Sequence, residues 1–305
     1  MKEQETVFLN SKLVCNSSKT IQPNILLRTG VFTPIGRRSK ANYVSIDLSN
    51  EFRNLELCQQ EGYDDVSIKG VKLSVETDFK IWCGIILSFS ELGGLSNKIT
   101  LKFSQFAAYC GYPSKRFDKN LRRQIGDSLG RIQSQSLSFQ RKNAVKGVHT
   151  GLLAKAVFDE VEDIVILVAD ESLWDLYQLD YQVLVSIKVL KQLPRAEVAQ
   201  CLYLYFVSLP EKPYPISFER LKIRLQLRTT NKEANRLITK GIQKLENIGF
   251  MIGQFIKKNG KNYYLIEKRY SKLKDVPSHR PIERYFLCPE QKLIRDENFV
   301  HICKK

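Results

Sequence analysis

The sequence lacks the residue patterns on which metal binding and nucleophilic catalysis usually depend. It has three histidines, His149, His279 and His301, and none forms a recognisable nucleophile setting with a serine or cysteine. Seven cysteines are widely spaced with no Cys-x-x-Cys pair, which argues against structural zinc. No Gly-x-x-x-x-Gly-Lys-Ser/Thr loop is present, so a P-loop ATPase is excluded. We therefore expect no metal, no cofactor and no enzymatic activity.

Long apolar stretches are also missing. The longest, residues 81–89 and 201–209, are far too short to cross a bilayer, so we expect no membrane partner. Residues 1–5 are not followed by the apolar core of a signal peptide. Cys83 and Cys201 lie inside these apolar runs and are interpreted as small buried hydrophobic residues. A reducing cytoplasm fits this cysteine usage best.

Negative charge is scarce in one part of the chain and concentrated in another. The 305 residues carry a net charge of +16, which favours a polyanionic partner such as nucleic acid. Residues 184–274 have 19 lysines and arginines against six glutamates and no aspartate. Residues 156–182 have eight acidic residues and no lysine or arginine. The composition, 43% hydrophobic and 10% aromatic, indicates a folded protein with one large core or two modest ones.

Two features leave room for a nuclease or a relaxase. Asp159, Glu160, Glu162 and Asp163 form a dense acidic group that is able to bind a divalent metal. No histidine or basic partner stands beside it, so we favour a solvated acidic edge next to a strand. The Tyr263-Tyr264 pair suggests a rolling-circle nucleophile, but such enzymes also need a histidine pair, which the sequence does not have. We interpret one tyrosine as core and the other as rim.

The most informative stretch is residues 229–248, which predicts a long basic helix. Its apolar residues recur at spacings of three and four and form one buried stripe. Thr229 or Thr230 is a suitable N-cap, and Gly249 suits the left-handed turn that ends a helix. The opposite face carries asparagine, lysine, arginine and threonine side chains, which read base edges and bind phosphates. Any solvated helix has a polar face, so the neighbouring elements must support this interpretation.

Those neighbours predict a winged-helix domain. A short helix precedes the long one and begins with Ser217 as its cap. Two strand-like runs follow, residues 250–256 and 262–266, joined by a tip that contains Asn259-Gly260. Asn-Gly between two such runs is the strongest short signal for a β-hairpin. Lysines at this tip are expected against phosphate or in a minor groove.

The first half of the chain repeats this order of elements. After strand-like residues 43–48 and 66–73 come, in turn, a core helix (77–89), a strand (98–103), a short helix (104–110), a long helix, a hairpin with a basic tip at 141–151, and a further strand (162–168). The long helix has an apolar stripe at Leu121, Ile125, Leu129 and Ile132. We therefore predict an α+β protein with two tandem winged-helix domains.

The predicted domain boundaries follow from the repeat. Residues 1–40 are interpreted as a flexible arm, 41–183 as the first winged-helix domain and 184–274 as the second. Residues 183–193 are expected to form a connecting helix that ends before Pro194. Residues 275–305 form an extension without a functional interpretation.

At this point the sequence resembles a known family, the Rep initiators of iteron-containing theta-replicating plasmids. The resemblance covers residues 43–270 and depends on residues 78–82, which open the first core helix, on residues 202–206 followed by 214–217, and on the doubled architecture. It implies tandem winged-helix domains in which the second binds a repeated origin site, the iteron, in double-stranded DNA. The first domain then adds DNA contact as a monomer and the interface between two copies as a dimer.

The resemblance also implies partners and regulation. Monomers of the family start replication together with host proteins such as a helicase or initiator, whereas dimers commonly repress the initiator's own promoter and so control copy number. The alternative is a tandem winged-helix transcriptional regulator that binds a promoter palindrome and supports no replication. A winged-helix protein-interaction module would lack the basic face of residues 229–248.

The resemblance assigns roles to individual side chains. Base readout falls to the first exposed turns of the long helix: Asn231, Lys232, Asn235, Arg236 and Thr239. Phosphates are expected at basic residues around that helix and at the hairpin tip: Arg228, Lys240, Lys244, Lys257, Lys258 and Lys261. The matching set in the first domain is Lys115, Arg116, Lys119, Arg122 and Arg123. Arg236 suits guanine and Asn235 suits adenine.

Overall fold

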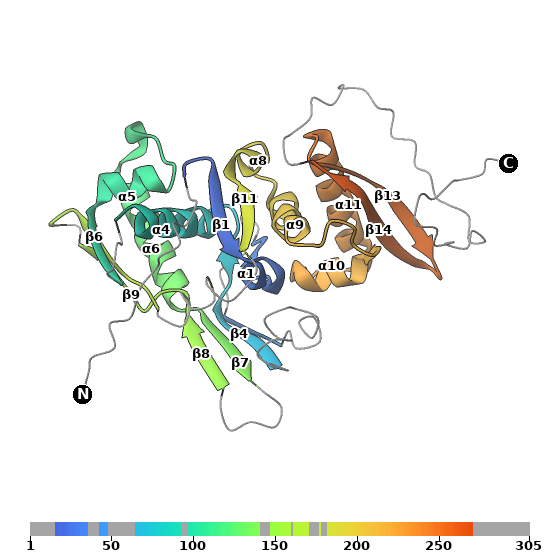
Figure 1. Cartoon of the computed structure of the whole chain (residues 1–305), viewed down its shortest axis with the longest axis horizontal. Coiled ribbons are helices and arrows are strands. Elements are labelled where there is room, and N and C mark those ends of the chain that lie inside the picture. Colours follow the sequence, from blue (N-terminus) through green and yellow to red (C-terminus); the bar gives the residue numbers. More distant parts are fainter. Residues whose placement is uncertain are drawn as a thin grey trace.

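The computed structural model describes residues 16–35, 43–47, 65–92, 97–140, 147–159, 161–170, 177 and 182–270. The extension at 275–305 lies outside these residues. The fold is α+β, and it contains two winged-helix units joined by a segment near the amino terminus (Figure 1).

The second unit has the predicted order of elements. It comprises α9 (Glu197–Val207), β12 (Ile216–Ser217), α10 (Phe218–Arg224), α11 (Asn231–Asn247), β13 (Met251–Lys258) and β14 (Lys261–Arg269). The sheet order is β12-β14-β13, so the wing hairpin β13–β14 extends a sheet that the short β12 begins. Asn259 and Gly260 both have positive φ, 50° and 72°, as the Asn-Gly turn requires. Gly249, with φ 71°, follows the end of α11.

The stripe on α11 packs against α9 as expected. Ala234, Ile238, Ile242 and Leu245 are fully buried. Gly241 allows the two helices to approach closely, because a Cβ there would lie 2.8 Å from Cδ1 of Leu202. The stripe thus fixes which face of α11 remains exposed.

The first unit repeats the same topology. Its elements are α4 (Asp78–Leu92), β6 (Lys98–Lys102), α5 (Phe103–Tyr109), α6 (Lys119–Gln133), β9 (Lys155–Asp159) and β10 (Ile164–Val168). The sheet order β6-β10-β9 matches β12-β14-β13 strand for strand. The predicted stripe of α6 is buried at all four positions. The internal repeat is therefore confirmed.

The predicted wing of the first unit is wrong. Residues 136–158 were expected to form the hairpin, but the wing is β9–β10. β7 (Ser136–Gln140) pairs instead with β8 (Gly147–Gly151) and with β4 (Asp65–Val71), which also pairs with β3 (Tyr43–Asp47). Residues 141–146 of the expected tip lie outside the described residues. Alternation of apolar and polar residues identifies a strand but not its partner, which explains the error.

The amino-terminal prediction also needs correction. Within the supposed arm, β1 (Lys19–Pro23), α1 (Asn24–Thr29) and β2 (Phe32–Thr33) are ordered, and the hydrophobic residues of α1 are buried. β1 pairs with β11 (Gln182–Ser186), which lies where a connecting helix was expected. In β11 Val183 and Val185 are buried while Gln182 and Leu184 are exposed, a period of two that favours a strand. Only α8 (Ile187–Lys191) is helical there.

This amino-terminal segment, residues 19–33, bonds to both units and lies between them (Figure 1). On the first unit, Trp82 donates its indole N–H to Oε1 of Gln22 at 2.8 Å. On the second unit, the Arg224 guanidinium donates to the carbonyl of Leu27. Arg28 in turn donates to the carbonyl of Ser208 at 2.9 Å. The two units therefore share one continuous core through residues 19–33.

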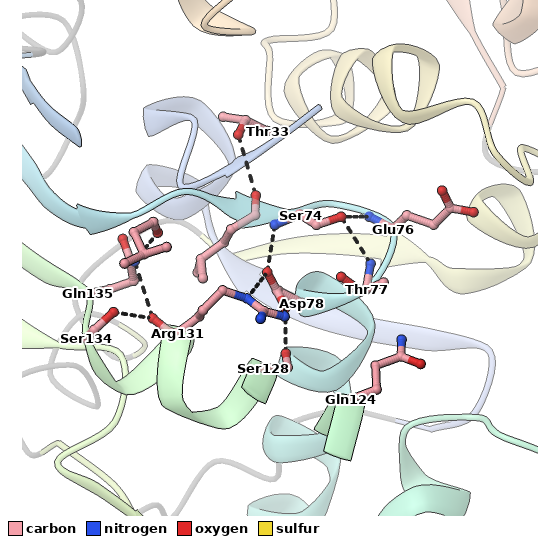
Figure 2. Close-up of polar contacts among 12 residues, drawn as sticks. Thr33, Ser74, Glu76, Thr77, Asp78, Gln124, Ser128, Arg131, Ser134 and Gln135 are labelled. Carbon is pink, nitrogen blue, oxygen red and sulfur yellow. Dashed lines mark hydrogen bonds and ion pairs between the residues drawn. The ribbon is translucent and has the colours of Figure 1, made fainter. Parts of the chain in front are cut away.

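A buried carboxylate holds α6 against α4 in the first unit. Figure 2 shows Asp78 between the main chain of Ser74 and the side chains of Ser128 and Arg131. The distances are 2.8 Å from the Ser74 N–H, 2.6 Å from Oγ of Ser128 and 2.7 Å from Nη2 of Arg131. Asp78 is fully buried and all its bonds are charge-assisted, so it fixes the position of α6.

One smaller prediction concerns the cysteines. Cys83 and Cys201 are buried, as expected from their apolar surroundings. In the described part of the chain, every helix is too short or too polar to cross a membrane.

Candidate nucleic-acid interface

The start of α11 is fixed by two side-chain contacts. Thr230 is the N-cap, and its hydroxyl accepts the N–H of Glu233 at 3.4 Å. Lys222 on α10 donates from Nζ to Oδ1 of Asn231 at 2.7 Å. The first turn of α11 is therefore held both by its own cap and by the preceding helix.

The side chains predicted to read bases lie together on this first part of α11. Asn231, Lys232 and Arg236 are exposed, while Asn235 and Thr239 are half-buried. Lys240 is exposed and Lys244 is half-buried further along the helix. All of them lie away from the buried stripe, so α11 presents one basic and amide-rich face.

The wing adds a second exposed basic group. Lys257, Lys258 and Lys261 surround the Asn259-Gly260 turn and are all exposed. Lys261 Nζ lies 3.4 Å from a carboxylate oxygen of Glu219 on α10, a contact that is solvent-exposed on both sides. Such exposed pairs are weak, so these lysines stay available to phosphate.

Behind the start of α11 the first unit comes close to the second. A groove of about 410 Å³ is lined by Ser45 of β3 and by Lys222, Arg228 and Asn231 of the second unit, among others. Lys72, between β4 and β5 (Leu73–Ser74), donates to the carbonyl of Gln226 at 3.5 Å. Burial lowers the pKa of Lys72, and the nearby Arg228 lowers it further. Lys72 was not among the predicted phosphate contacts, because nothing in its local sequence signals this neighbour.

Arg236 does not stand free on α11. Its Nε and Nη2 donate to the two carboxylate oxygens of Glu233 at 2.8 and 2.7 Å. The hydrogen bonds from Arg236 lower the pKa of the Glu233 carboxyl. The three-residue spacing of Glu233 and Arg236 on a helix is a signal for this pair, and the prediction for Arg236 did not include it.

A buried contact joins the wing to the far end of α11. Tyr264 on β14 is fully buried, and its hydroxyl donates to Oε1 of Glu246 at 2.6 Å. Burial raises the pKa of Glu246, against the opposing effect of this hydrogen bond. Tyr263 is half-buried, so one tyrosine is core and the other is rim, as expected.

The matching basic set of the first unit is arranged differently. Lys115, Arg116, Lys119 and Arg123 are exposed near the start of α6. Arg122, however, is ion-paired with Asp163 at the first wing and stacks over the ring of Phe103, 4.2 Å from its centroid. Four of the five predicted side chains are therefore exposed, whereas Arg122 contacts Asp163 and Phe103 within the unit.

The tip of the first wing is acidic where the second is basic. Residues 159–163 between β9 and β10 read Asp-Glu-Val-Glu-Asp. Asp159 Oδ1 accepts the main-chain N–H groups of Val161 and Glu162, at 2.9 and 3.0 Å, so it shapes its own turn. Among the described residues no cluster of three or more acidic, histidine or cysteine side chains is arranged to hold a metal.

Comparisons with known proteins show which proteins this chain is similar to. No family model matches the chain. It is 46% identical over 262 residues to "Protein RepA" of Escherichia coli, an alignment that covers 86% of this chain and 91% of that protein. It is 44% identical to "Replication protein RepA" of Escherichia coli, which covers 86% of this chain and 92% of the relative. Among solved structures, domains 2 and 3 of RctB match with a TM-score of 0.52 at 14% identity, over 81% of this chain and 98% of theirs. That likeness shows the fold alone.

Proposed function

The chain belongs to the family of RepA replication proteins, and from this premise we propose that it is a plasmid replication initiator that binds iterons in double-stranded DNA. The observation that carries the proposal is the exposed basic and amide-rich face of α11 beside a basic wing. A helix of this kind fits the major groove, and a lysine-tipped hairpin beside it meets the flanking backbone.

The proposed contacts divide into two kinds. Asn231, Lys232, Asn235, Arg236 and Thr239 read base edges, with Arg236 on guanine and Asn235 on adenine. The basic residues of the second wing and around α11 bind phosphates and set the register. Lys115, Arg116, Lys119 and Arg123 give the first unit an auxiliary backbone contact, whereas Arg122 is withdrawn from it by Asp163.

The rest of the proposal concerns assembly. The first unit, within residues 41–183, carries the interface between two copies, and the second, within 184–274, carries the main DNA contact. Monomers open the origin in the cytoplasm and recruit a host helicase or initiator. Dimers repress the promoter of the initiator's own gene and so limit copy number.

A replication test in cells decides the proposal. A plasmid that carries the repeated origin sites but not the gene is introduced with or without a second source of this protein. We expect replication only when the protein is supplied, and loss of replication with Arg236→Ala. A protein that represses a promoter palindrome but never supports replication would instead be a transcriptional regulator, and the proposal would be wrong.

A further inference from the structure

We infer that Glu233 determines sequence specificity at this interface. Its ion pair with Arg236 disfavours contact between Arg236 and DNA phosphates but is compatible with contact between Arg236 and a guanine–cytosine base pair. The inference deepens the proposed function and depends on it. Glu233 was not among the residues predicted to contact DNA.

The geometry of the pair is well defined. Both carboxylate oxygens of Glu233 accept from the planar fork of Arg236, at 2.7 and 2.8 Å. The side chains are 41% and 60% exposed, so the pair lies on the surface that faces the proposed DNA. Fork-to-fork contact of this kind fixes the orientation of both groups and occupies two of the five N–H donors of the guanidinium.

The placement of Glu233 on α11 is also informative. It stands three residues after the N-cap Thr230, where a glutamate commonly turns back to bond the N–H of the cap residue. Here both of its oxygens face Arg236 instead. Its own N–H is held by Thr230, and the amino end of the helix favours its negative charge. The carboxylate is thus held beside Arg236, which must break its hydrogen bonds with Glu233 before it can contact DNA.

An acidic residue in this position is costly for simple electrostatic binding. α11 contains two glutamates and no aspartate, and the other glutamate, Glu246, bonds the buried Tyr264 at the far end. Glu233 therefore introduces a negative charge among Lys232, Arg236 and Lys240, which weakens attraction to any phosphate. An exposed pair three residues apart adds little to helix stability, so stability alone does not account for it.

The chemistry of the bases explains what such a pair gains. Guanine offers two acceptors to Arg236 in the major groove, and cytosine offers an amino donor that Glu233 can accept. A guanine–cytosine pair therefore satisfies both side chains. A phosphate satisfies Arg236 but brings a second anion against Glu233. Discrimination then arises from a repulsive contact as well as an attractive one.

The test compares Glu233→Gln with the wild-type full chain on two duplexes. One duplex is selected by the wild-type protein from a randomised pool, and the other is a scrambled version of it. We expect Glu233→Gln to bind the scrambled duplex more tightly, with a salt slope steeper by about 0.9, because one more cation reaches phosphate. The ratio of selected to scrambled affinity should fall about fivefold, because the released arginine adds a phosphate contact on the scrambled duplex while it stays on guanine in the selected one.

Glu219→Gln provides a matched control. It removes the same charge from an exposed side chain, 68% exposed on α10, whose contact is Lys261 of the wing and not a base-reading arginine. We expect it to tighten binding to both duplexes alike and to leave their ratio unchanged. Circular dichroism spectra of both variants check that the helices are intact.

A double variant separates this inference from the proposed function. In an Arg236→Ala background, Glu233→Gln should no longer change the ratio of affinities. The inference is overturned if Glu233→Gln leaves the ratio at the wild-type value, or if it lowers the ratio equally without Arg236. If Arg236→Ala itself leaves the ratio unchanged, the proposed readout by α11 fails instead.

Discussion

The two winged-helix units have the same topology but opposite surface charge at their wings. β6-β10-β9 and β12-β14-β13 are equivalent sheets, and α6 and α11 are equivalent long helices. The second wing ends in three exposed lysines, whereas the first ends in Asp-Glu-Val-Glu-Asp. A shared topology therefore does not fix the surface charge of a unit, because the two wing tips carry opposite charge.

The difference extends to how each long helix is held. In the first unit, α6 uses two of its arginines internally, Arg122 on Asp163 and Arg131 on the buried Asp78. In the second unit, α11 packs on α9 through an apolar stripe and leaves its cations at the surface. Both helices bury an apolar stripe, but α6 is additionally anchored by these two ion pairs. The following changes test this contrast in order of decreasing expected effect.

Asp78→Ala should have the largest effect, on the stability of the first unit. It leaves Arg131 and the Ser74 N–H without their acceptor, and breaking a buried ion pair from one side costs about 3 kcal/mol or more. Urea-induced unfolding followed by circular dichroism measures the free energy of unfolding. Ser128→Ala, which removes a single hydrogen bond to the same carboxylate, should cost only about 1 kcal/mol. Equal losses for the two variants would contradict the anchoring role of the ion pair.

Arg236→Ala and Arg122→Ala test the equivalent helices for DNA readout. Arg236→Ala should weaken binding to a selected duplex by about 1–3 kcal/mol and relax the choice of sequence. Arg122→Ala should barely change DNA binding, because its guanidinium is already engaged by Asp163 and Phe103. Fluorescence anisotropy titrations with selected and scrambled duplexes measure both. The assignment of Arg236 is wrong if its removal weakens the two duplexes equally.

Lys258→Ala and Glu162→Gln compare the two wing tips. Lys258→Ala should weaken binding to every duplex alike and reduce the magnitude of the salt slope by about 0.9. Glu162→Gln on the first wing should leave the slope unchanged if that wing lies away from DNA. A steeper slope for Glu162→Gln would place the acidic wing beside the phosphates and remove the contrast.

Glu246→Gln should have the smallest effect, and it depends on pH. Burial raises the pKa of Glu246, so the folded chain holds this proton more firmly than the unfolded chain does. The resulting stabilisation is present below the ordinary pKa and is lost as pH rises through the raised value. Glutamine cannot ionise and still accepts from Tyr264. The variant should therefore gain stability relative to wild type near neutral pH, by less than about 1 kcal/mol. Thermal melting at pH 5 and pH 8 measures the gain, and a larger gain at pH 5 would contradict it.

Local patterns in the sequence were sufficient for much of the second unit. The spacing of Ala234, Ile238 and Leu245, the Thr230 cap and the Asn259-Gly260 turn are short-range signals, and each was found in the structure. The first wing was misassigned because two hairpins, β7–β8 and β9–β10, follow each other, and a strand pattern does not show which of them joins the sheet that β6 begins. The burial of residues 19–33 depends on contacts across the chain, such as Gln22 with Trp82, that no local pattern contains.

The same limits apply to the candidate site. The charge of each side chain on α11 is plain from the sequence, but its partner is not. Arg122 and Arg236 both lie in the first turns of a long helix, yet Arg122 pairs with the wing turn of its own unit and Arg236 with a neighbour on its own helix. Lys72 belongs to the site only because the two units lie close together, which brings it to the carbonyl of Gln226. Charge alone therefore does not distinguish cations that are already ion-paired within the protein from cations that are able to contact DNA.

The amino-terminal segment has a mechanical consequence. Residues 19–33 hydrogen-bond to Trp82 of the first unit and to Arg224 of the second, so the two units do not move independently. A rotation of one unit relative to the other must first break a hydrogen bond of Gln22, Leu27 or Arg28. Residues 19–33 therefore fix the distance between α6 and α11, and a protease or antibody that displaced this segment would free both units to move.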